Sequence, residues 1–275
     1  MLEFLPYLIV ALLYLAVAFD FWRPGFQAKS PLSGRALRWH SIAILAGLLL
    51  HGWLLYGSLF LSSINGGLNL GLTNALSAIF WLTVLIYWVT DLKHHLHSLQ
   101  AFVLPPAALF VLLQELLPET HLLPYAEQPL FKLHLVIAML AYSLFTFAAL
   151  HALLMAAAES NLHQKASLIK LPDFPPLITM ETLLFRIIWL GFILLTLTLI
   201  SGFVFSEQLF HQAMKFNHKN VFTLISWLIF AGLLLGRQVY GWRGRTAIRW
   251  TLTGFVVLLL AYVGSKFVLE ILLHR

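Results

Sequence analysis

Twelve histidines, in a chain that has no cysteine, are the side chains best suited to chemistry. Imidazole is a common axial ligand of haem iron, and it also titrates near neutral pH. The absence of cysteine excludes disulfides, thiolate metal sites and thiol redox chemistry carried by this chain. The histidines therefore indicate either ligation of iron or handling of protons, and their positions decide which of them are candidates.

His134 and His218 are the first two candidates. Each stands at the beginning of an apolar segment, and His218 is followed directly by Lys219. Two imidazoles from different helices suit a bis-histidine haem, and nearby lysines can pair with its propionates. We therefore expect His134 and His218 to ligate iron. The alternative for each is an interfacial or solvated histidine that water and backbone groups satisfy.

His51 is the histidine most clearly at membrane depth. It lies about 18 Å into its apolar segment at a helical rise of about 1.5 Å per residue. An ionisable residue inside a membrane is costly to bury, which makes His51 a candidate cofactor ligand or proton-handling group. A neutral histidine hydrogen-bonded to a neighbouring helix is the open alternative. His151 presents the same choice.

The run His94, His95 and His97 suggests a zinc site, yet Asp91 is the nearby carboxylate and no cysteine accompanies it. Structural zinc sites usually draw four ligands from cysteine and histidine. We therefore expect a solvated turn between two helices here. The chain also lacks a nucleophile elbow, a phosphate-binding loop and a paired intramembrane carboxylate, so the sequence predicts no independent catalytic activity.

The elements that position these histidines are membrane helices. Hydrophobic residues make up 60% of the chain and charged residues only 10%, against about a quarter in soluble domains. Apolar segments near 20 residues span a bilayer as helices. The sequence thus predicts an all-α, polytopic membrane helical bundle of about eight transmembrane helices, forming a single domain over residues 1–275. The expected spans are 2–21, 39–61, 70–90, 96–117, 133–157, 183–205, 220–236 and 250–272.

The basic residues predict the orientation. The net charge is +6, but lysine and arginine flank apolar spans instead of forming a soluble basic patch, so we expect no nucleic-acid partner. Arg237, Arg243, Arg245 and Arg249 follow the seventh span, and by the positive-inside rule they mark the cytoplasmic side. Both termini are then external, with His134 and His218 on the external side, and the first helix does not resemble a cleaved signal peptide.

Two local features shape the middle of the chain. Pro105 and Pro106 remove backbone donors inside the fourth span and are expected to kink it. The segment 160–182 is polar and carries three prolines, so we expect a surface loop with at most a short interfacial helix. Trp227 lies inside the seventh span, where it either packs between helices or lines a groove for a hydrophobic cofactor.

Three groups of residues together resemble the cytochrome c assembly protein family, over roughly residues 133–264. The C-terminal group consists of Lys219, Leu224, Ile225, Trp227, the run Gly241 to Arg245, Gly254, Phe255, Tyr262, Val263 and Gly264. The preceding group consists of Pro175, Pro176, Leu177, Glu181, Arg186, Gly191, Phe192, Leu195, Thr196 and Gly202. His134 with Tyr142, Ser143 and Phe145 forms the third. Within this family of haem-handling CcsA-type and CcmC-type membrane proteins, the chain is most similar to YpjD-type inner membrane proteins.

The resemblance implies a bacterial inner-membrane protein that holds haem at its periplasmic face, between a tryptophan-rich loop and external histidines, for attachment to apocytochrome c. His134 matches one of those histidines. The loop departs from the family pattern, because Phe216 and Asn217 stand where tryptophan and aspartate are expected. The family's histidine at the inner end of the following span is also replaced, around Gly236.

We therefore expect a role in cytochrome c biogenesis that includes the handling of haem. Besides the lipid bilayer, the expected partners are apocytochrome c or other membrane subunits of the assembly system. The expected cofactor is haem, and the expected site consists of His134, His218, His51, Lys219, Phe216 and Trp227. The departures in the loop leave a second hypothesis open. In it, the chain is a non-haem accessory membrane protein or transporter subunit that has kept the fold without the haem platform.

Overall fold

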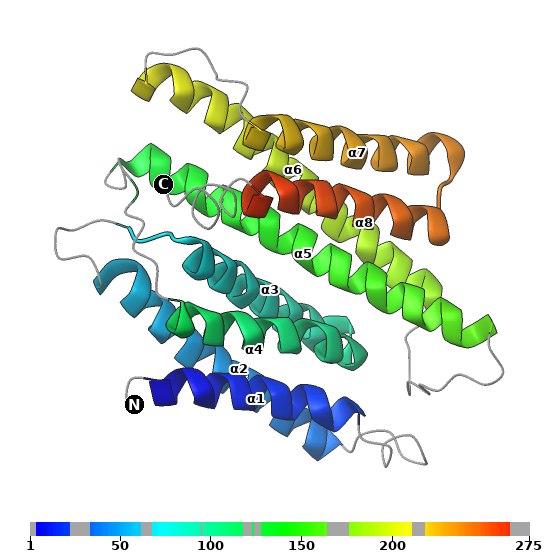
Figure 1. The fold of residues 1–275 in the computed structure, drawn as a ribbon. Coiled ribbons are helices and arrows are strands. Elements are labelled where there is room, and N and C mark those ends of the chain that lie inside the picture. The colour runs from blue at the N-terminus through cyan, green and yellow to red at the C-terminus, as the bar shows by residue number, and fades with distance from the viewer. Residues whose placement is uncertain are drawn as a thin grey trace. The chain divides into compact units, whose positions relative to one another are not determined.

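The computed structural model describes residues 4–22, 34–61, 68–94, 96–117, 123, 128–163, 176–210 and 218–264, and nearly all of them are helical (Figure 1). The α-helices of this described part are α1 (Phe4–Trp22), α2 (Gly34–Tyr56), α3 (Leu72–His94), α4 (Gln100–Leu116), α5 (Pro129–His163), α6 (Leu177–Phe210), α7 (His218–Tyr240) and α8 (Arg245–Leu259). Three short helical turns accompany them, namely η2 (Gly57–Leu61), η3 (His97–Leu99) and η4 (Leu260–Gly264).

Each apolar segment predicted from the sequence overlaps one of these helices, which confirms the all-α polytopic membrane bundle. By length and composition, 6 helical stretches of the described residues can cross a membrane: Arg38–Phe60, Leu72–His94, His97–Leu116, Pro129–Ser160, Leu177–Val204 and His218–Tyr240. The first helix has a shorter apolar stretch, Phe4–Asp20. The number of eight spans stays a prediction.

The polar segment between α5 and α6 is shorter than the sequence suggested, because α5 continues to His163 and α6 already begins at Leu177. The carbonyl of Pro176 accepts hydrogen bonds from the backbone N–H groups of Thr179 and Met180, at 2.8 and 3.1 Å. Proline is well tolerated at the first turn of a helix, where its missing N–H would have no helical partner. The expectation of a loop up to residue 182 was therefore wrong at its C-terminal end.

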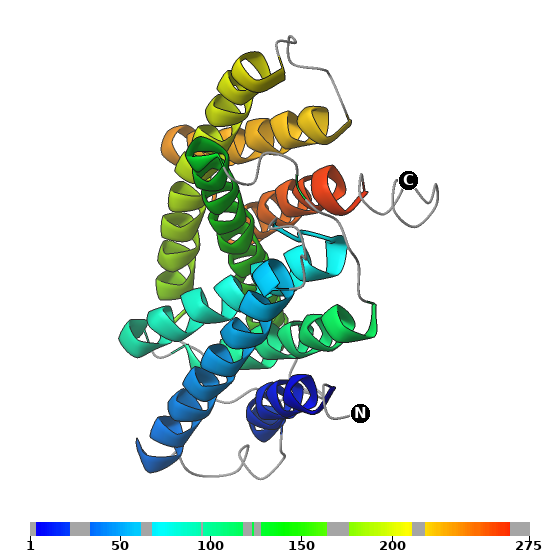
Figure 2. The same ribbon diagram turned by 90° about the vertical axis from the view of Figure 1, so that its left-hand side faces the viewer.

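The chain divides into two compact units, which are described separately. Unit 1 comprises Met1–Pro124 and Leu154–Met180 and contains α1 to α4. In this unit α1 packs against α4 and α2, and α3 packs against α2 and α4, as Figures 1 and 2 show. Helix α4 continues through Pro105 and Pro106, and the Phe110 ring that follows them stacks on Phe80 of α3 with 4.8 Å between centroids.

Unit 2 comprises Tyr125–Leu153 and Glu181–Arg275, and it holds the first part of α5, most of α6, and α7 and α8. Phe145 of α5 stacks on Phe230 of α7 with ring centroids 4.0 Å apart. A Cβ added at Gly191 of α6 would lie 3.2 Å from the Phe145 ring, and one at Gly254 of α8 would lie 2.8 Å from Phe230. Small residues at such positions let membrane helices approach closely. The single domain predicted over residues 1–275 stays a prediction.

Candidate functional site

His134 lies on α5 in unit 2, where its ring is held by a hydrogen bond to α6. The distance from His134 Nδ1 to Ser201 Oγ is 2.7 Å. The Ser201 hydroxyl donates its own proton to the carbonyl of Leu197 at 2.7 Å, so its oxygen accepts from His134. This assigns the proton of the neutral imidazole to Nδ1 and its lone pair to Nε2. Nε2 is the nitrogen through which a neutral imidazole in this tautomer can ligate a metal.

A positive charge acts on His134, and the amine that carries this charge lies near a pair of tyrosine rings. The charge of Lys219, at the beginning of α7, acts on the His134 ring. The Lys219 Nζ lies 5.9 Å from the ring centroid of Tyr262, which in turn contacts Tyr142 with ring centroids 5.7 Å apart. Gly202 adds to the space beside His134, because a Cβ there would lie 3.5 Å from its Cε1. We call His134, Ser201, Lys219, Tyr142 and Tyr262 the His134 cluster.

Three other predicted site residues belong to this part of the chain, namely His218, Trp227 and Phe216. His218 is the first residue of α7 and is exposed, directly before Lys219. Trp227 lies further along α7, where its indole N–H donates to Thr196 Oγ1 on α6 at 2.9 Å and its ring stacks on Phe192. Trp227 therefore packs α7 against α6. Phe216 lies outside the described residues.

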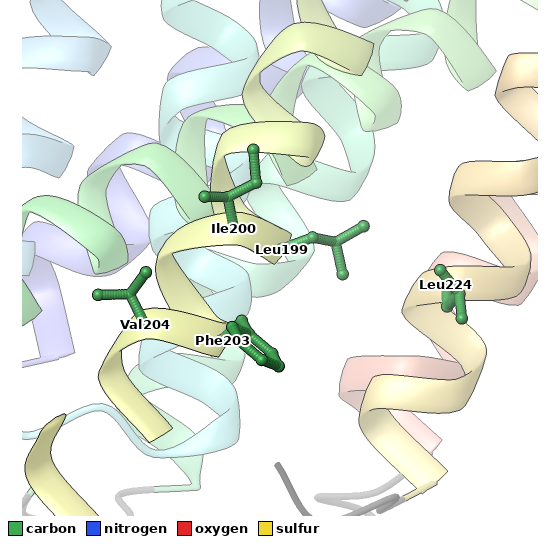
Figure 3. A pocket seen from close by; sticks show the side chains of 5 residues that line it. All are labelled: Leu199, Ile200, Phe203, Val204 and Leu224. Atoms are coloured by element: carbon green, nitrogen blue, oxygen red, sulfur yellow. The ribbon is translucent and has the colours of Figure 1, made fainter. Parts of the chain in front are cut away.

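An apolar hollow of about 310 Å³ lies between α6 and α7 in unit 2. Figure 3 shows its lining, which consists only of apolar side chains: Leu199, Ile200, Phe203, Val204 and Leu224. Neither His134 nor Ser201 belongs to this lining, and the lining offers no ligand for iron.

His51 is fully buried in unit 1, and both of its ring nitrogens have hydrogen-bond partners. Nε2 lies 2.9 Å from Ser77 Oγ on α3, and Nδ1 lies 3.5 Å from the Tyr14 hydroxyl on α1. Ser77 donates to Gln114 Oε1 on α4 at 2.6 Å, so it accepts from His51. The neutral ring is thereby protonated on Nε2, with Tyr14 donating to Nδ1. As a ligand, His51 would first have to release one of these partners.

The same chain of bonds continues beyond Gln114. Its Nε2 donates to Ser58 Oγ at 2.7 Å, and Ser58 donates to the carbonyl of Leu54 at 3.2 Å. These hydrogen bonds join α1, α2, α3 and α4 in unit 1. Each group donates to the next one, from the Tyr14 hydroxyl to the backbone carbonyl of Leu54. We call Tyr14, His51, Ser77, Gln114 and Ser58 the His51 network. Sequence reasoning found His51 but not its partners. Their signal was the presence of polar side chains, such as Ser77 and Gln114, inside apolar segments.

The end of unit 2 that carries the run Gly241 to Arg245 is held together by one carboxylate. Glu181 Oε1 accepts from Arg237 Nη1 at 2.6 Å and from Arg243 Nε at 2.8 Å. Its Oε2 accepts from the backbone N–H of Gly244 at 3.2 Å, directly before α8. Gly241 and Gly244 have φ values of +66° and +54°, which favour glycine. This part of the family pattern therefore fixes the connection between α7 and α8.

Gly236, where the family's inner histidine is replaced, is covered by a tryptophan ring. The backbone N–H of Trp242 donates to the carbonyl of Gly236 at 3.2 Å, and the indole folds back over the same residue. Even a Cβ at Gly236 would overlap the Trp242 ring. The described backbone thus leaves no room for a histidine side chain at this position.

The turn between α3 and α4 is more buried than the solvated turn that we expected. Leu96, Ser98 and Leu99 are buried, and His97 Nδ1 lies 3.1 Å from Asp91 Oδ2. No group of three or more histidine, aspartate or glutamate side chains in the described part of the chain is placed to hold a metal ion. His95 lies outside that part. The cause of the burial is that the short turn brings the beginning of α4 directly against the end of α3.

Comparison with known proteins identifies similar chains. The family model described as cytochrome C assembly protein matches residues 39–273. The inner membrane protein YpjD of Escherichia coli K12 is 28% identical over 237 residues, which are 86% of this chain and 84% of that protein. A cytochrome c biogenesis protein CcsA of Prochlorococcus marinus is 28% identical over 179 residues, 58% of each chain. The corresponding protein of another strain is 25% identical over 289 residues, 94% of this chain and 89% of its own length.

Proposed function

The chain belongs to the cytochrome C assembly protein family and is a multi-pass inner-membrane protein of the cytochrome c biogenesis type, and from this premise we propose that it binds haem at the His134 cluster. The observation that carries the proposal is the hydrogen bond from His134 Nδ1–H to Ser201. Histidines that ligate metals usually donate their other ring N–H in this way, because the bond fixes the tautomer and the ring orientation.

The remaining members of the cluster suit other parts of a haem. Lys219 is exposed and carries the positive charge that a propionate requires. The partly exposed Tyr262 ring provides aromatic surface beside Lys219, and the buried Tyr142 ring contacts it. Bound haem supplies an iron that accepts the lone pair of a neutral imidazole. The chain's own contribution is to hold His134 in the required tautomer and to place a cation nearby.

His218 is the proposed second iron ligand, and Phe216 and Trp227 are proposed to support the haem from α7 and the segment before it. His218 is adjacent to Lys219 and exposed, so its ring is accessible from the end of α7. His51 belongs to unit 1 with both ring nitrogens hydrogen-bonded, and we propose for it the role of a bonded neutral histidine. This choice follows the alternative that its sequence position left open.

We propose that the His134 cluster faces the periplasm. Arg237, Arg243, Arg245 and Arg249 gather at the opposite end of α7 and the beginning of α8. Basic residues of this kind mark the cytoplasmic side. Haem held at the other end would then face apocytochrome c or other membrane subunits of an assembly system, which are the proposed partners.

Haem titration of the purified full-length chain tests the proposal. The native chain develops a Soret band, His134→Ala abolishes it or weakens it strongly, and Ser201→Ala lowers haem affinity by about 10-fold to 100-fold because the ligand loses its orienting bond. The matched control is Thr198→Val on the same helix, whose hydroxyl bonds only the Leu194 carbonyl at 2.8 Å. Equal haem affinity of the native and His134→Ala chains would contradict the proposal.

The second candidate, a non-haem accessory membrane protein, is favoured by one observation. Phe216 and Asn217 stand before α7 where the family pattern has tryptophan and aspartate. Under this hypothesis His134→Ala and His218→Ala leave function in cells intact, while Glu181→Ala, which releases the connection between α7 and α8, abolishes it. Loss of function in the two histidine variants, with protein levels unchanged, favours haem binding instead.

A further inference from the structure

The end of unit 1 that carries the turn between α3 and α4 contains an unusual set of buried polar atoms. Four side-chain atoms there have no hydrogen-bond partner among the described residues: Tyr87 OH, Asp91 Oδ1, Ser98 Oγ and Gln100 Nε2. Tyr87, Ser98 and Gln100 are 0%, 3% and 1% exposed. Folded proteins contain few such atoms, because an unbonded buried polar group costs free energy.

These four atoms belong to one short helix–turn–helix segment. Tyr87 and Asp91 are four residues apart on α3 and therefore share one face of that helix. The other oxygen of Asp91 reaches His97 in the turn, at 3.1 Å, and Ser98 is the next residue. Gln100 begins α4, which packs against α3. The carboxylate thus joins the end of α3 to the turn that carries Ser98 and leads into Gln100.

Helix α4 also contains a proline one turn after its beginning. Pro105 lies inside the helix and has no N–H to donate to the carbonyl of Ala101, the residue after Gln100. Prolines inside membrane helices are tolerated where water or neighbouring side chains bond the carbonyl that they leave. The two prolines that α4 contains are therefore consistent with a polar ligand beside its first turn.

The chemistry of the set indicates a neutral ligand. Tyr87 and Ser98 can donate or accept, Gln100 Nε2 can only donate, and Asp91 Oδ1 can only accept. A cation would meet the donating amide of Gln100, and an anion would meet the carboxylate of Asp91. Water both donates and accepts, and a buried water typically makes about three hydrogen bonds to protein groups.

We infer that the α3–α4 end of unit 1 is a binding site for internal water, held by Tyr87, Asp91, Ser98 and Gln100. The water satisfies the four buried atoms and hydrates the Asp91 carboxylate, which His97 contacts on its other oxygen. This site is separate from the His51 network, since Ser77 and Gln114 of that network lie near the opposite ends of α3 and α4. It is independent of haem binding, because the His134 cluster belongs to unit 2.

Thermal unfolding of the purified full-length chain distinguishes bound water from unbonded atoms by the sign of the change. If water bonds these groups, Tyr87→Phe and Ser98→Ala each lower the Tm by about 2–4 °C, because the water loses a partner. If the atoms are truly unbonded, removing them raises the Tm. The matched control is Thr83→Val, whose buried hydroxyl donates to the Ile79 carbonyl of its own helix at 2.8 Å.

The double variant and a direct observation complete the test. Combining Tyr87→Phe with Ser98→Ala lowers the Tm by less than the sum of the single decreases, since both residues share the water. A rise in Tm, a change no larger than that of Thr83→Val, or fully additive decreases overturn the inference. High-resolution density of the native chain shows the water between the four atoms, independently of how the variants fold. A direct contact between Tyr87 and Asp91 in its place also overturns it.

Discussion

His134 and His51 show how the partners of a histidine set its chemistry. In His134 the proton lies on Nδ1, because Ser201 already donates to its own helix, and the lone pair lies on Nε2. In His51 the proton lies on Nε2 and is donated to Ser77, while Nδ1 accepts from Tyr14. The first arrangement suits ligation, whereas the second commits the whole ring to helix packing. Residue type alone would treat the two as equal candidates.

Gln114→Leu tests the His51 network at the scale of one residue. The substitution leaves the Ser77 donor and the Ser58 oxygen without their central partner, so it lowers the free energy of unfolding by about 1–3 kcal/mol. Denaturant unfolding in detergent measures this change. Thr146→Val is the control, because its hydroxyl bonds only the Tyr142 carbonyl at 2.8 Å. An equally stable Gln114→Leu chain would show that the network contributes nothing to packing.

At the scale of elements, one carboxylate on α6 organises the connection between α7 and α8. Glu181 takes the place of an N-terminal cap for α8, because it accepts from Gly244 directly before that helix. It also binds Arg237 from the last turn of α7 and Arg243 from the connection itself. The Trp242 ring then closes over Gly236. The arginine-rich run therefore has a structural use as well as its expected role in setting the orientation.

Glu181→Gln tests this arrangement. The amide keeps the size of the side chain but loses the negative charge that two guanidinium groups contact, so the free energy of unfolding falls by about 1–3 kcal/mol. This decrease is smaller than that expected for breaking a fully buried ion pair, because the Arg243 side chain is 58% exposed and water weakens its attraction to Glu181. Thermal unfolding measures the decrease. Glu115→Gln, which removes a carboxylate that joins no ion pair among the described residues, is expected to change little, and an equal effect of both would contradict the arrangement.

At the scale of the whole molecule, the chain is a multi-pass helical membrane protein whose two compact units carry different polar features. Unit 1 holds the His51 network and the proposed water site, and unit 2 holds the His134 cluster and the Glu181 contacts. The predicted orientation rests on α7, a helix about 33 Å long that has His218 at its first residue and Arg237 in its last turn.

Single cysteines provide a direct test of this orientation, since the native chain has none. His218→Cys in intact cells is expected to react with a membrane-impermeant maleimide, whereas Tyr240→Cys reacts only after the cells are opened. Tyr240 is 76% exposed at the other end of α7, so access by the reagent depends on the side of the membrane. The native chain serves as the unlabelled control. The reverse labelling pattern would place the His134 cluster on the cytoplasmic side.

The sequence by itself determined the helices, the membrane class and the family pattern. Apolar segments of spanning length form helices because each backbone group must be bonded within its own segment, and this is a local property. The tertiary structure decided which nitrogen of His134 and His51 carries the proton, because Ser201 and Ser77 lie 67 and 26 positions away along the chain. It also decided that Glu181 binds Arg237 and that the turn after α3 is buried. Hydropathy does not specify which faces of membrane helices meet, because lipid tails and apolar side chains are nearly equivalent partners.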